Sequence, residues 1–431
     1  MPGFGHTTPA PPTMTVSTLT PETEARLRVA ALVCASLFVV ALPFNHTTAL
    51  RLITLGLAAA FTFASGGWRV AGLLPLRASW VAWAGIAALS LVYAYDPLDS
   101  FGEFRNEVVC AFLAYATWYT LARHRDGTAW LVRAIVAAVA GALVVGISVF
   151  VSGRPWFDLG DFGDVGSLTT FLITVLPVLL LLALRSAPHS AARAGAVVLV
   201  AGCLAAGFLT LNRIFWLAAA VEIIIFSLFS MRHWKSRRRG VSLLIGVAVV
   251  AGLALAQVLL ASHSRIALSA PGTDILDFLV DDPRGDLWRF AVERIAEHPW
   301  VGAGIGKWSM RGAFDAHFHD TLRLHAHNVF LNRALEMGLP GVAVFVALLM
   351  AVVVAFWRLT DSDDAQTAAL GAAGLALVAG VVVKNLTDDF FVRQNALLFW
   401  SLTGAALGAA STPQVPRSAA RSPSRDTRPA I

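Results

Sequence analysis

The chain is 431 residues long, and 57% of its residues are apolar while only 14% are charged. A soluble enzyme carries about 25% charged residues, so the composition excludes that class. Uncharged stretches of about 16–22 residues recur along the sequence, and a helix of this length crosses a hydrocarbon core of about 30 Å. Because lipid cannot hydrogen-bond to exposed backbone groups, these stretches predict an all-α polytopic membrane protein.

The net charge of +6 does not indicate a nucleic-acid partner, because the basic loops of a membrane protein account for much of it. The three cysteines, Cys34, Cys110 and Cys203, all lie in apolar runs. We therefore expect them to be small core residues and not disulfide partners or zinc ligands.

In chain order, residues 1–25 are rich in Pro and Thr, lack the basic segment of a signal peptide, and predict a disordered cytoplasmic tail. Nine transmembrane helices are predicted within residues 26–261, one long loop containing short helices over 262–340, and three more helices within 341–410. Residues 411–431 predict a second disordered cytoplasmic tail. The twelve predicted spans are approximately 29–44, 49–65, 78–95, 107–122, 130–152, 167–184, 194–210, 214–230, 241–261, 341–357, 367–383 and 396–410.

The Lys and Arg residues of the short loops set the orientation, because cytoplasmic loops retain more of them. With the N-terminus inside, the cytoplasmic side collects eighteen, including the run Arg237–Arg239, and the opposite side collects six. We therefore expect both termini in the cytoplasm and the 262–340 loop outside. The six on the outer side are Arg51, Arg105, Arg154, Arg213, Lys384 and Arg393.

The long outer loop contains six of the eleven histidines. Its segment from Asp286 to Glu297 places apolar side chains at helical spacing, so we predict an amphipathic helix lying on the membrane surface. Gly302, Gly304 and Gly306 follow this segment. Their spacing matches neither the dinucleotide-binding nor the P-loop pattern, so a tight, mobile turn is favoured over a phosphate-binding loop.

Four arginines on the outer side are candidate ligands for an anionic lipid head group. The planar, permanently charged guanidinium suits phosphate oxygens. The alternative for each of them is a snorkelling or ion-paired side chain. The candidates are Arg213, Arg284, Arg289 and Arg265.

Two histidines, His325 and His327, precede a helical pattern that is expected to end at Gly338, and an apolar run starts after Gly341. A histidine at the mouth of a membrane span is a candidate base near neutral pH for a hydroxyl group. Two neighbours, Asn328 and Glu336, are candidates to orient or polarise it.

Two other interpretations of the histidines remain open. A metal site would also include His317 and His319, but the loop has no HExxH pattern, and histidines two residues apart point in different directions on a helix. Alternatively, the histidines cap the following helix and pack as polar residues.

The histidine stretch resembles the bacterial O-antigen ligase and polymerase superfamily. The ligase signature is His, then Asn, Ser or Gln, then nine residues and Gly-x-x-Gly. It is matched at this spacing by His327, Asn328, Gly338 and Gly341.

Two further segments are similar to the same family. Residues Pro283–Trp288 and His298–Gly304 resemble its Arg-x-x-x-Trp and Pro-x-x-Gly-x-Gly segments. Leu211–Arg213 resembles a Ser-Arg element in an outer loop, although Asn212 departs from that pattern.

The resemblance implies transfer of O-antigen from undecaprenyl diphosphate to an acceptor on the periplasmic face of the inner membrane, among membrane lipids. For a ligase, the acceptor is lipid A–core. It implies an inverting reaction that needs no metal, nucleotide or other cofactor. On this basis His327 is expected to be the base, with His325 as an orienter or second candidate. The diphosphate is assigned to Arg284, Arg213, Arg289 and Arg265.

Alternative functions remain. An O-antigen polymerase or a protein O-oligosaccharyltransferase uses the same carrier and shares much of the loop pattern. Twelve spans alone are also typical of a membrane transporter. Transporters usually show internal repeats and ionisable groups near the middle of the membrane. Here, beyond the first three residues of each predicted span, only Glu222 and Arg133 are charged, and no repeat is evident.

Overall fold

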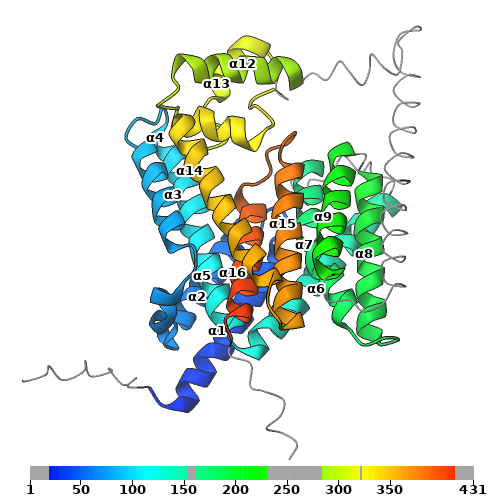
Figure 1. Cartoon of the computed structure of the whole chain (residues 1–431). Coiled ribbons are helices and arrows are strands. Elements are labelled where there is room, and N and C mark those ends of the chain that lie inside the picture. Colours follow the sequence, from blue (N-terminus) through cyan, green and yellow to red (C-terminus); the bar gives the residue numbers. More distant parts are fainter. Residues whose placement is uncertain are drawn as a thin grey trace, which may run out of the picture.

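The computed structural model describes residues 19–152, 162, 164–210, 212–231, 252, 284–320 and 323–412. Every regular element within these ranges is a helix (Figure 1). The predicted disordered tail, residues 1–25, is helical from Pro21 onward, and its residues 1–18 lie outside the described residues. Almost all of the span 241–261, Arg265 and residues 413–431 lie outside them as well.

The helices fall into two groups along the sequence. The N-terminal group contains α1 (Pro21–Ala41), α2 (Thr48–Ala64), the 3₁₀ helix η1 (Gly67–Leu73), α3 (Arg77–Ser90), α4 (Pro97–Phe104), the π-helix η2 (Arg105–Cys110), α5 (Ala111–Ala122), α6 (Arg125–Val151), α7 (Val165–Arg185), α8 (Ala191–Leu209) and α9 (Arg213–Met231). The C-terminal group contains α12 (Arg284–Glu297), α13 (Arg311–Phe318), α14 (Val329–Thr360), α15 (Ala365–Lys384) and α16 (Arg393–Ala410).

Six helices of the described part are long and apolar enough to cross a membrane, namely α6, α7, α8, α9, α14 and α15. The predicted spans over α1, α2, α3, α5 and α16 also coincide with helices. However, α2, α3 and α5 have only 17, 14 and 12 residues, and α1 begins with a charged segment that contains Glu22, Glu24, Arg26 and Arg28. The chain is therefore an all-helical, multi-pass membrane protein, while the count of twelve spans stays a prediction.

Small residues allow close helix packing in the core. A Cβ atom on Gly404 or Gly408 of α16 would lie 2.2 or 2.1 Å from the backbone carbonyl oxygens of Tyr115 and Tyr119 on α5. Helices in membranes often associate through such small residues, because lipid provides no hydrophobic driving force between them.

Helix α14 is interrupted at Gly338, the position where the sequence predicted the end of a helix. Gly338 is its one non-helical residue, with φ 68° and ψ −175°. Pro340 has no N–H to donate, and the N–H of Leu339 donates instead to the carbonyl of Pro299 at 2.8 Å. The result is a kink that separates a short head, residues 329–337, from a longer apolar segment, residues 339–360.

Helices α12 and α13 lie together at one end of the bundle, next to the head of α14 (Figure 1). The apolar face of α12 was predicted to lie on the membrane surface. Instead, its Leu287, Phe290 and Ala291 are buried in a cluster with Phe314 of α13 and Leu335 of α14. This face of the amphipathic helix therefore contacts protein.

The glycine turn, residues 302–306, is hydrogen-bonded to the head of α14. The N–H groups of Ala303 and Gly304 donate to the carbonyls of Leu335 and Glu336, each at 2.9 Å. Gly304 has φ +101°, and a Cβ atom there would lie 2.5 Å from the Cβ of Ala94. Through these contacts the turn connects the head of α14 to the segment that follows α3.

Candidate active site

Two loops meet at the end of the bundle where α12 and α13 lie. The histidine loop, residues 323–328, precedes α14, and the acidic loop, residues 385–392, joins α15 to α16. The side-chain amide of Asn328 donates to the carbonyl of Leu386 at 2.8 Å. The N–H of Val329 donates to the carbonyl of Asn385 at 3.0 Å.

Asn328 also caps α14. Its Oδ1 accepts from the N–H groups of Phe330 and Leu331, at 2.9 and 3.1 Å. This is the ordinary role of Asn before a first helical turn. Asn328 therefore positions the loop and does not act directly on a reacting group.

His327 is the more accessible histidine of the pair in the histidine loop. Its φ is +48°, a left-handed conformation that non-glycine residues seldom adopt and that is often found at functional sites. Its side chain is 22% exposed, and its Nδ1 lies 3.8 Å from Oδ1 of Asp388. This distance exceeds a hydrogen bond but fits a carboxylate that orients an imidazole before substrate is bound.

Asp388 is held in its charged form. Burial opposes that charge, but the ammonium of Lys384 and the adjacent His327 outweigh burial and keep the pKa of this carboxyl well below its usual range. The Nζ of Lys384 lies 2.8 Å from Oδ2 of Asp388. The site thus contains a fixed negative charge beside the imidazole of His327.

His325 has a different environment from His327. It is only 4% exposed, and its Nδ1 accepts from the N–H of His327 at 3.1 Å. Trp308 contacts its ring edge-on, with centroids 5.2 Å apart. Burial, and then the positive charge of Lys307, hold the pKa of His325 well below its usual range, so it is neutral near pH 7 with its proton on Nε2.

A second layer of polar residues fixes the two loops. Asn332 accepts from the N–H of Ala326 at 3.0 Å and donates through its amide to the carboxylate of Asp389. The ammonium of Lys307 donates to the carbonyl of Asp389 at 2.7 Å. The contacts with Asp389 join segments that are distant in sequence.

Glu336, a candidate orienter in the sequence, lies in a different cluster. Its carboxylate pairs with Nη1 of Arg333 at 2.6 Å, and Nη2 of the same guanidinium pairs with Glu107 of η2. All three side chains are buried. Glu336 therefore helps to connect α14 to η2.

The candidate arginines occupy three different environments. Arg284 is the first residue of α12, and this helix is tied to the histidine loop because Nε1 of Trp288 donates to the carbonyl of Ala326 at 3.0 Å. Arg289 is exposed on the same helix and pairs with Asp286 at 3.2 Å. Arg213 is the exposed first residue of α9.

Of the four clustered histidines, His325 and His327 have ring centroids 3.9 Å apart, while the other two have different surroundings. His317 stacks on Phe290 with centroids 4.4 Å apart, and His319 ends α13 in a left-handed conformation. Within the part of the chain that the structure describes, no group of three His, Cys, Asp or Glu residues is arranged to hold a metal ion.

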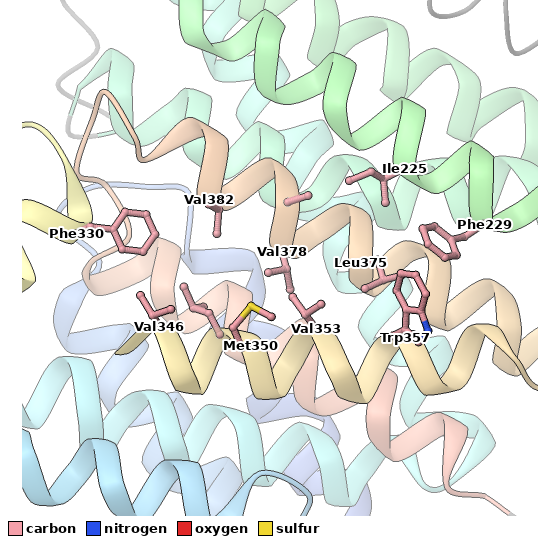
Figure 2. A pocket seen from close by; sticks show the side chains of 12 residues that line it. Ile225, Phe229, Phe330, Val346, Met350, Val353, Trp357, Leu375, Val378 and Val382 are labelled. Atoms are coloured by element: carbon pink, nitrogen blue, oxygen red, sulfur yellow. The ribbon is translucent and has the colours of Figure 1, made fainter. Parts of the chain in front are cut away.

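An apolar groove of about 380 Å³ begins beside the histidine loop. Phe330, in the first turn of α14, lines one end, and Trp357 lines the other (Figure 2). Between them, side chains of α14 face α15, while α9 contributes Ile225 and Phe229. The groove thus follows three helices of the membrane-spanning bundle, and Phe330 at one end is close in sequence to the histidine loop.

Comparison with models of protein families gives a match. The family model described as O-antigen ligase matches residues 195–346, less than half of the chain. This region includes α12, α13, the histidine loop and the kink at Gly338. A search of curated proteins finds none that matches the chain.

Proposed function

We propose, from the premise that this chain belongs to the O-antigen ligase superfamily, that it is an O-antigen ligase of the bacterial inner membrane. It moves O-antigen polysaccharide from undecaprenyl diphosphate to lipid A–core on the periplasmic face. The observation that carries this proposal is the pairing of His327 with Asp388 at the head of an apolar groove.

His327 acts as the general base. Asp388 faces its Nδ1 and favours the tautomer with a proton on that atom, which leaves Nε2 to accept one. Nε2 takes the proton of the acceptor hydroxyl as the hydroxyl oxygen bonds to the anomeric carbon of the donor. The bond from that carbon to the diphosphate breaks, and its electron pair leaves with the diphosphate. A single displacement of this kind inverts the anomeric centre.

His325 is a positioning residue. Its buried, neutral imidazole accepts the N–H of His327 and thereby supports the left-handed backbone there. Because its Nδ1 is already used in this bond and its ring lies against Trp308, it is poorly placed to accept a proton from a substrate.

The leaving diphosphate requires fixed positive charge. Arg284 is our first candidate, because Trp288 of its helix is hydrogen-bonded to the histidine loop. Arg213 and Arg265 are further candidates, and Arg289 would have to leave Asp286 to take part. Guanidinium groups stabilise a departing diphosphate by charge-assisted hydrogen bonds that need no metal ion.

The apolar groove suits the polyprenyl chain of the donor. Its lining is almost entirely aliphatic and aromatic, and it opens between helices that are long enough to cross the membrane. A lipid tail in this groove would bring the attached diphosphate to the level of Phe330, directly after the histidine loop.

The decisive experiment compares donor affinity with transfer rate in purified, full-length variants. His327→Ala should lower the rate by about 10²–10⁴-fold, the usual contribution of one positioned base, while donor affinity stays unchanged. Asp388→Asn should lower the rate less, because it removes only the orienting charge.

Transfer should persist in EDTA, and a loss that Zn²⁺ restores would assign the histidines to a metal site. If His325→Ala abolishes transfer while His327→Ala keeps it, the base is His325.

Arg284→Ala should behave differently from His327→Ala. It removes charge from the diphosphate in both the bound donor and the product, so donor binding and transfer should weaken together. Arg284→Lys should recover only part of the loss, because the two-pronged hydrogen bonding is absent. Equal donor affinity in Arg284→Ala and wild type would remove Arg284 from the diphosphate site.

Lipopolysaccharide from a deletion strain separates the ligase from the polymerase. A lost O-antigen ladder, with intact core and accumulated carrier-linked polysaccharide, supports the ligase. A core capped by a single repeat instead identifies a polymerase.

A further inference from the structure

We propose that a polar cavity of about 290 Å³ beside the histidine loop is a subsite for a negatively charged sugar residue of the acceptor. This inference rests on the proposed ligase function, because it identifies where the second substrate binds. The cavity lies between the starts of α2, α7 and α16, with α4, η2 and the acidic loop completing its wall. Its charged lining residues are Arg51, Glu103, Glu107, Asp164, Lys307 and Arg393.

Arg51 provides the main evidence for an anionic ligand. Its side chain is 7% exposed, and its guanidinium donates only to uncharged oxygens, those of Gln394 and Thr48, each at 3.1 Å. Its Nε has no partner among the residues that the structure describes. A buried positive charge without a counter-ion is unfavourable, so a phosphate or carboxylate in the cavity would satisfy it.

Two carboxylates indicate that the ligand also carries hydroxyl groups. Glu103 pairs through Oε1 with Arg393 at 2.8 Å, and Glu107 pairs through Oε2 with Arg333. The second oxygen of each is buried and accepts no hydrogen bond from any described residue. A hydroxyl can both donate and accept a hydrogen bond, so the ring hydroxyls of a sugar fit these two oxygens. Hydroxyls and a negative charge occur together in phosphorylated and acidic sugars.

The size of the cavity limits what it can hold. Pockets for small ligands start at about 300 Å³, so this space suits one substituted sugar and not a polysaccharide chain. The anion would face Arg51, and the ring hydroxyls would face Glu103 and Glu107.

The position of the cavity assigns it to the acceptor. The apolar groove is lined by α9, α14 and α15, with Phe330 as its lining residue nearest the histidine loop, whereas the cavity is lined from α2, α4 and α7. Trp308 lines the cavity and touches His325, while Lys307 lines it and donates to Asp389, the neighbour of Asp388. A lipid-linked donor and a sugar acceptor can thus meet at His327 from two directions.

The test measures binding without requiring transfer. The probe is core oligosaccharide released from lipopolysaccharide, used with its phosphates and after enzymatic dephosphorylation, with full-length protein in detergent. Wild type should bind the phosphorylated form about 10- to 100-fold more tightly, as expected for one charge-assisted contact. Arg51→Gln should lose this preference, and Arg51→Lys should keep part of it. The matched control is Arg105→Gln, an exposed arginine of η2 outside the cavity, which should behave as wild type.

The outcomes separate this proposal from the ligase assignment. Equal binding of both probes by wild type, with Arg51→Gln binding them as tightly as wild type, overturns the subsite for any anionic sugar. An Arg51→Gln protein that still prefers the phosphorylated probe also overturns it. In transfer assays Arg51→Gln should raise KM for the acceptor about 10-fold or more and leave KM for the donor unchanged. A rise in donor KM alone would overturn the acceptor assignment. If phosphate-dependent binding through Arg51 is observed but no transfer occurs, the ligase proposal fails and the anionic-sugar subsite stands.

Discussion

At the scale of single residues, the site separates two histidines that the sequence could not distinguish. His325 and His327 are two positions apart in a stretch with no regular period. The fold buries His325 to 4% exposure and leaves 22% of the His327 side chain exposed, next to Asp388. Burial, charge and backbone conformation therefore assign the proposed roles.

The neutral state of His325 predicts a dependence of stability on pH. Because its pKa is lowered in the folded protein, only the unfolded chain binds a proton there below about pH 6.5, the ordinary histidine value. The unfolded state then holds more protons, so stability contributed by His325 is complete above this pH and falls as the pH drops. The loss approaches about 1.4 kcal/mol per pH unit.

The measurement is Tm in detergent between pH 7 and pH 5. Wild type should lose Tm over this range, and His325→Asn should show a shallower slope. His298→Asn, at an exposed position after α12, is the control and should retain the wild-type slope. Identical slopes for His325→Asn and wild type would contradict the assignment of a neutral, buried His325.

At the scale of elements, the sequence predicted more of the helices than of their connections. The long apolar runs predict most ends of helices α6 to α9, α14 and α15 to within a few residues. They do so because the bilayer constrains the length and polarity of a membrane-spanning helix. The acidic loop has no such constraint. Asp388 is distant in sequence from His327, and the two loops come together through contacts such as the backbone bond from Val329 to Asn385.

Some signals for the residues of the acidic loop are present in the sequence. Lys384 is a basic residue on the predicted outer side, against the charge bias, and that position fits a counter-ion for Asp388. By contrast, the sequence indicated Glu336, and not Asp388, as a candidate to orient His327, because Glu336 is close to His327 in the sequence. On a helix, however, the three-residue spacing of Glu336 from Arg333 determines its partner.

The motif glycine Gly338 offers a test at this scale. Its φ of +68° disfavours any side chain by about 1–2 kcal/mol. A Cβ atom there would also lie 2.7–2.9 Å from the backbone of Trp300 and Pro299. Gly338→Ala should therefore lower Tm and displace the head of α14, with a loss of transfer.

The matched control for this substitution is Gly312→Ala. Gly312 lies in α13, where an added Cβ would meet no atom within 4 Å, and Ala favours a helix by about 1 kcal/mol over Gly. Its Tm should stay the same or rise. If the two variants have equal Tm values, the kink does not depend on glycine at position 338.

At the scale of the whole molecule, polar chemistry is concentrated at one end of the bundle. The histidine loop and the acidic loop lie at the end where α12 and α13 are found (Figure 1). Residues of the acidic loop line the polar cavity, and Phe330, close after the histidine loop, lines one end of the apolar groove. The kink in α14 produces this arrangement. Residues 339–360 alone rise about 33 Å at 1.5 Å per residue, enough for a hydrocarbon core of about 30 Å, so the head of α14 can lie outside the lipid.

This geometry allows a direct test of orientation, which the excess of basic residues in the predicted cytoplasmic loops motivates. Ala316 is exposed on α13 near the start of α14, and Asp363 is exposed just beyond its other end. In cells with a permeabilised outer membrane, a membrane-impermeant thiol reagent should label Ala316→Cys and spare Asp363→Cys. Both variants are made in a chain whose native Cys34, Cys110 and Cys203 are replaced, so that labelling reports only the new thiol. Labelling of both positions would mean that α14 does not cross the membrane. The reverse pattern would place His327 in the cytoplasm, and the proposed periplasmic transfer would then be wrong even if every contact at the site were correct.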